Sequence, residues 1–80
     1  MKRAERDAWI SEALSLVEEG TLCQSKFRSS LSISFKNALG PNPEHPSWTV
    51  AQIVRADAEA LGCHPRFDPK LLKLDWPSGR

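Results

Sequence analysis

The sequence lacks tyrosine and long apolar runs, and it has only two cysteines, Cys23 and Cys63. No stretch approaches the roughly 20 consecutive apolar residues that a membrane-spanning helix needs, so we predict no insertion into a membrane. A single disulfide would be sparse for a small secreted domain, where several bridges are usual, and no apolar leader follows Met1. We therefore expect a cytoplasmic protein with reduced thiols.

The sequence also lacks an excess of charge of one sign. Eleven Lys and Arg residues stand against ten Asp and Glu residues, which gives a formal net charge of +1. A nearly neutral chain produces no strong overall field. Any affinity for nucleic acid would therefore have to come from an uneven placement of the charges.

The chain is nonetheless apolar enough to fold, because 40% of its 80 residues are hydrophobic. We predict one helical domain over residues 1–80. Its first helix is predicted over residues 4–19, with Gly20 as the residue that ends it. Arg3 and Asp7 have the spacing of an ion pair on one helix face. The apolar stripe of this helix consists of Trp9, Ile10, Ala13, Leu14, Leu16 and Val17.

A second helix is predicted over residues 21–39. Thr21 and Gln24 have the spacing of a capping box, in which each side chain accepts a hydrogen bond from the other residue's backbone N–H. The apolar residues of this segment then recur every four positions, as Phe27, Leu31, Phe35 and Leu39. The alternative is a strand over residues 30–35, where serine alternates with apolar residues. The four-residue pattern extends over thirteen residues and the alternation over six, which favours the helix.

A proline-rich connector at residues 40–47 precedes a third helix. Thr49 and Gln52 have the capping-box spacing at its start, and Gly62 would end it. Asp68 and Pro69 are typical of the start of a further short helix, and residues 77–80 are expected to fray. The predicted fold is all-α, a small bundle of three main helices plus a short C-terminal helix.

The sequence offers little for catalysis or for metal binding. Zinc sites use paired ligands at short spacing, and among the soft ligands only Cys63 and His64 are neighbours. The four glycines stand alone and form no phosphate-binding loop. We predict that the protein is not an enzyme and that it has no metal and no cofactor.

Two groups of basic residues could contact nucleic acid. Residues 58–63 resemble the first helix and turn of a helix-turn-helix, in which a small residue stands four positions before a turn glycine. Pro65 and Pro69 depart from that pattern, and the helix that follows is short for base reading. The basic side chains that could meet phosphates are Arg55, Arg66, Lys70 and Lys73 around this motif, and Lys26, Arg28 and Lys36 on the serine-rich second helix.

Aromatic residues near the loops indicate a protein partner instead. Trp48, Phe67 and Trp76 lie in or beside proline-containing segments, and exposed aromatic side chains are common hot spots of protein interfaces. The sequence therefore predicts a binding module, and it slightly favours a nucleic-acid-associated regulator of helix-turn-helix type. The close alternative is an adaptor or inhibitor that binds another protein. Inhibitors of this size are encoded by phages and mobile elements, anti-CRISPR proteins among them. A homodimer is compatible with both alternatives.

Overall fold

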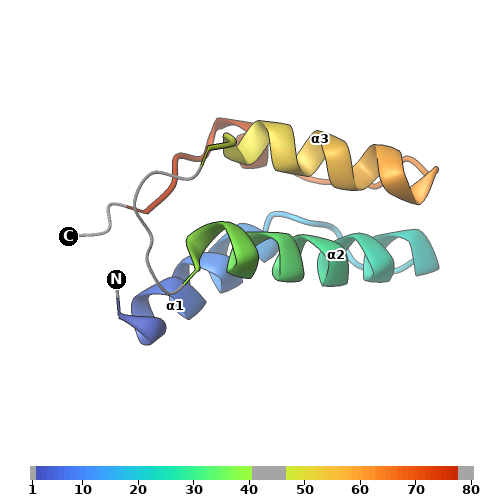
Figure 1. The fold of residues 1–80 in the computed structure, drawn as a ribbon. Coiled ribbons are helices and arrows are strands. Elements are labelled where there is room, and N and C mark those ends of the chain that lie inside the picture. The colour runs from blue at the N-terminus through green and yellow to red at the C-terminus, as the bar shows by residue number, and fades with distance from the viewer. Residues whose placement is uncertain (1, 41–46, 78–80) are drawn as a thin grey trace.

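A computed structural model describes residues 2–40 and 47–77, and its elements are helical (Figure 1). They are α1 (Arg3–Leu14), α2 (Leu22–Leu39), α3 (Val50–Leu61) and a short 3-10 helix, η1 (Pro69–Lys73). No strand is present in these two ranges. The predicted all-α fold with three main helices and a short C-terminal one is confirmed. Most of the predicted connector (41–46) and of the predicted frayed end (78–80) lie outside the described residues.

Helix α2 is the central element, because it packs against both α1 and α3. Phe27, Leu31 and Phe35 of α2 are fully buried and lie in one apolar cluster with Ile10 of α1 and Val54 of α3. The serine-rich segment is helical throughout, so the strand alternative for residues 30–35 is wrong. The apolar residues at four-residue steps decide the structure here, since they place one continuous stripe in the core.

Helix α1 ends five residues earlier than predicted, at Leu14. The chain beyond it pairs with a distant segment: Val17 forms an isolated antiparallel bridge with Phe67. The Asp68 N–H donates to the Leu16 carbonyl at 2.7 Å, and the Glu18 N–H donates to the Arg66 carbonyl at 3.1 Å. After a turn at Ser15 and Leu16, these bonds tie residues 16–18 to residues 66–68, so Gly20, although its φ is +128°, does not cap the helix.

The start of α3 follows the sequence prediction. The Gln52 N–H donates to the Thr49 hydroxyl at 3.2 Å, and the Thr49 N–H donates to the Gln52 side-chain oxygen at 2.8 Å, so the capping box is complete. Gly62 ends the helix in the left-handed conformation at φ +63°. The chain then turns back along α3, and η1 packs against that helix (Figure 1).

Cys23 and Cys63 form a disulfide that joins the start of α2 to the turn after α3. The prediction of two reduced thiols is therefore wrong. The prediction rested on composition, because a single disulfide is few for a small secreted domain. The turn at Gly62 nevertheless brings Cys63 close to Cys23. None of the helices in the described ranges is long and apolar enough to cross a membrane.

Candidate binding face on helix α2

The structure separates the basic residues that were predicted to contact nucleic acid. Lys26 and Lys36 are exposed on α2. Arg28 is half-buried, and its Nη1 donates to the carbonyl oxygens of Leu14 at 2.7 Å and Val17 at 3.2 Å. Leu14 is the last residue of α1 and Val17 lies in the segment just after it, so Arg28 caps that helix. The remaining four residues of the set are exposed on α3 and on the segment after it: Arg55, Arg66, Lys70 and Lys73.

The helix-turn-helix comparison needs a second helix long enough to read bases in the major groove. At the position of that second helix the structure has η1, a 3-10 helix of five residues. It is about 10 Å long at the usual rise of this helix type. Asp68 caps it by accepting from the Lys70 N–H, and Pro69 opens it, as predicted. Its Leu71 is fully buried, so η1 serves to close the core.

Two of the three aromatic residues predicted to bind a protein pack onto the core. The Phe67 ring stacks on Phe27 with a centroid separation of 5.7 Å. The Trp76 ring lies 5.4 Å from Trp9, and its Nε1 donates to the backbone oxygen of Trp48 at 2.6 Å. Only the Trp48 side chain stands out to solvent, with 52% of the residue exposed.

A different apolar surface lies on the side of α2 that faces away from the core. Leu22 and Ile33 are the most exposed large hydrophobic residues of the described chain, at 71% and 62%. Eleven residues of an α-helix make three turns, so these two side chains point within about 20° of each other and lie about 16 Å apart along the axis. We define the outer face of α2 as the residues of this stripe, Leu22, Lys26, Ser29, Ile33 and Lys36.

The outer face is positively charged, and no acidic residue of α2 offsets this charge. Helix α2 contains Lys26, Arg28 and Lys36 and no Asp or Glu among its 18 residues. The sequence analysis identified the two lysines of this face but not Leu22 or Ile33. The sequence did contain the information needed to find them, because Leu22 and Ile33 lie on the side of the helix opposite the four-residue apolar repeat that forms the core.

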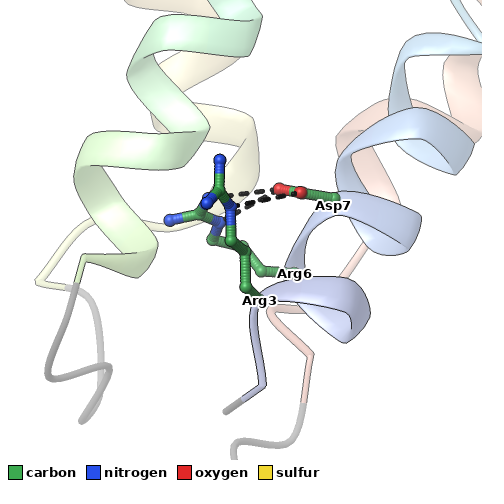
Figure 2. Close-up of polar contacts among 3 residues, drawn as sticks. All are labelled: Arg3, Arg6 and Asp7. Atoms are coloured by element: carbon green, nitrogen blue, oxygen red, sulfur yellow. Dashed lines mark hydrogen bonds and ion pairs between the residues drawn. The ribbon is translucent and has the colours of Figure 1, made fainter.

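A shallow cleft of about 360 Å³ adjoins the outer face, between α1 and α2. Ile10 and Leu14 provide its apolar floor. Its polar side chains are Arg3, Arg6, Asp7, Ser11, Ser32 and Lys36. Figure 2 shows the Arg3 and Arg6 guanidinium groups meeting at the Asp7 carboxylate on the α2 side of α1. The Arg3–Asp7 pair predicted from the sequence is present at 3.9 Å, whereas Arg6 was not predicted to take part.

Within residues 2–40 and 47–77, no group of three or more His, Cys, Asp or Glu side chains comes together to hold a metal ion. In comparisons with known proteins, no family model matches the sequence, and no curated protein or solved structure matches it significantly.

Proposed function

We propose that this protein is a non-enzymatic binding module that docks on an acidic protein surface through the outer face of α2. The observation that carries the proposal is the coincidence of two large exposed hydrophobic residues and two lysines on one helical stripe, without an acidic residue in the helix. A single exposed leucine is ordinary on a protein surface. Two aliphatic side chains about 16 Å apart on one face fit an interface with two apolar contacts.

The charge of the face determines which kind of partner fits. Lys26 and Lys36 would attract an acidic surface and speed its association, and they would repel a basic one. A second copy of the chain is a poor occupant, because two such faces would bring lysines together without a carboxylate from either α2. We therefore favour a different, acidic protein over a homodimer formed through this face.

Nucleic acid is the alternative that the sequence favoured, and the exposed cations Lys26 and Lys36 still support it. Affinity for duplex DNA grows with the number of phosphates neutralised. Arg28 is taken up by two backbone carbonyls, and η1 is short for a recognition helix. These two observations favour a protein partner over a duplex.

The disulfide gives a new basis for proposing the compartment in which the protein acts. Disulfides persist mainly in oxidising compartments and are rare in the cytosol. The Cys23–Cys63 bond therefore supports an oxidising site of action in place of the cytoplasmic one predicted from reduced thiols.

The test is capture of partners from a nuclease-treated lysate of the source cells by three immobilised proteins. These are the natural sequence, the double variant Leu22→Ser/Ile33→Ser, and the control Trp48→Ser, which removes the third large exposed hydrophobic residue of the described ranges. We expect the natural sequence and the control to retain the same acidic protein and the double variant to lose it. All three should give the same helical circular dichroism, because the changed side chains are exposed.

Two outcomes would contradict the proposal. Loss of capture with Trp48→Ser alone would move the interface to the loop tryptophan. Capture that disappears on nuclease treatment, together with affinity for random duplex DNA that falls steeply with salt, would favour the nucleic-acid alternative.

A further inference from the structure

The cleft between α1 and α2 is an unusual part of the surface because its cations outnumber its anions. Arg3, Arg6 and Lys36 line it, and among the described residues Asp7 is the only carboxylate that does so. The two other acidic residues of α1, Glu5 and Glu12, are not part of the lining. The cleft therefore has an excess of positive charge, although the whole chain is close to neutral.

Asp7 neutralises this charge only in part. Nε and Nη2 of Arg6 both donate to the same oxygen, Oδ1 of Asp7, at 3.2 Å. Nε of Arg3 lies 3.9 Å from the other oxygen, Oδ2. Two guanidinium groups thus share one carboxylate, and they present more N–H donors than its two oxygens can accept.

The cleft and the outer face form one continuous surface because Lys36 belongs to both. Ser32 lines the cleft and is the chain neighbour of Ile33 on the outer face. A segment that covers Ile33 would therefore bring its neighbouring side chains to the mouth of the cleft. The Ser11 and Ser32 hydroxyls offer further donors there.

We propose that the cleft binds a carboxylate side chain of the acidic protein partner, with Arg3, Arg6 and Lys36 as its ligands. This inference rests on the proposed function and adds an ionic contact to the apolar one. Guanidinium groups suit this role because their planar donors match a carboxylate in a bidentate arrangement. Asp7 opposes the incoming carboxylate, because it competes for the same donors and has the same charge.

The proposal predicts opposite effects for two substitutions in one cleft. The experiment follows the amide resonances of Ser11 and Ser32 while N-acetyl-hexaglutamate is added to the isotope-labelled protein. Removing a cation in Lys36→Gln should weaken binding by about two- to fivefold, the range for one exposed ion pair. Removing the competing carboxylate in Asp7→Asn should strengthen binding by a similar factor of about two to five.

The control is Arg55→Gln, which removes one positive charge from an exposed position on α3 outside the cleft. We expect it to leave the affinity unchanged. The proposal is overturned if Arg55→Gln weakens binding as much as Lys36→Gln, because the effect would then be that of net charge. It is also overturned if Asp7→Asn weakens binding or leaves it unchanged.

Two further titrations at the same ionic strength test the class of ligand. Inorganic phosphate that shifts the same amides with equal affinity would overturn the assignment to a protein carboxylate and show a site for small anions. A six-residue oligothymidylate that binds more tightly than hexaglutamate would assign the cleft to nucleic acid. The expected order is hexaglutamate first, with both other probes weaker.

The result is separable from that of the capture experiment. If Leu22→Ser/Ile33→Ser abolishes capture while Asp7→Asn, which changes the cleft but not the outer face, leaves capture unchanged, the proposed function stands and the cleft is not part of the interface. If the double variant still captures the partner, the proposed function fails, whatever the titration shows.

Discussion

Gln24 and Arg66 are joined across 42 positions of the chain by a reciprocal pair of hydrogen bonds. Nε2 of Gln24 donates to the Arg66 carbonyl, and Oε1 of Gln24 accepts from the Arg66 N–H, each at 2.6 Å. The same Nε2 donates to the Glu18 carbonyl at 2.8 Å. With only 4% of Gln24 exposed, this amide acts as a buried clamp between the start of α2 and the two segments, 16–18 and 66–68, that pair with each other.

We predict that Gln24→Leu lowers the free energy of unfolding by about 2 to 3 kcal/mol. The substitution keeps a side chain of similar volume but leaves the Arg66 N–H and the Glu18 carbonyl without their partner, while the Arg66 carbonyl keeps only the Glu18 N–H. Chemical denaturation followed by circular dichroism measures the change.

The matched control is Gln52→Leu, because Gln52 is the exposed glutamine of the α3 capping box. There we expect a loss of at most about 1 kcal/mol, the usual value of a helix cap. Equal losses in the two variants would contradict the clamp.

Gln24 also shows where local sequence patterns stop predicting the structure. Thr21 and Gln24 have the spacing of a capping box, and half of it forms, since the Thr21 hydroxyl accepts from the Gln24 N–H at 3.1 Å. The Gln24 side chain does not complete the box, because it is bound to the N–H and the carbonyl of Arg66. At α3 the same spacing gives the full box, because the Gln52 side chain is at the surface.

The helices that were predicted well are those whose limits depend on nearby residues. The limits of α2 and α3 follow from their caps and from apolar steps of three and four residues. The end of α1 depends on residues 66–68, which lie about fifty positions away along the chain, and no local pattern records that pairing. The disulfide is also a long-range contact, so composition alone misjudged it.

The candidate site was predicted in part, for the same reason. Lys26 and Lys36 follow from the helical periodicity, because they lie opposite the buried residues of α2. Arg28 is a basic residue of the same serine-rich helix and was predicted together with them. Its two carbonyl partners are free to accept from it only because α1 ends early, which the sequence did not predict. The cleft depends on how α1 packs beside α2, which the sequence does not show.

We predict that Arg28→Ala lowers the free energy of unfolding by about 1 to 2 kcal/mol, because it leaves the Leu14 and Val17 carbonyls without a charged donor. Lys26→Ala removes the same charge from an exposed site on the same helix and should change stability by less than about 0.5 kcal/mol. Thermal denaturation of both variants measures the difference. If Arg28→Ala is as harmless as Lys26→Ala, the guanidinium does not cap α1.

Removing the disulfide should produce the largest loss of stability. The bond closes a loop of 40 positions, and restricting an unfolded chain by a loop of this length is worth about 4 kcal/mol in the chain-entropy model. We expect Cys23→Ser/Cys63→Ser to lose about that amount in urea denaturation, and a reducing agent to have the same effect on the natural sequence but none on the double variant. This comparison separates loss of the bond from any packing change that the serines cause, because the reducing agent leaves both cysteine side chains in place.

If the reducing agent does not change the stability of the natural sequence, the thiols are already reduced in the folded protein. That outcome would remove the support for an oxidising compartment and restore the prediction made from cysteine content.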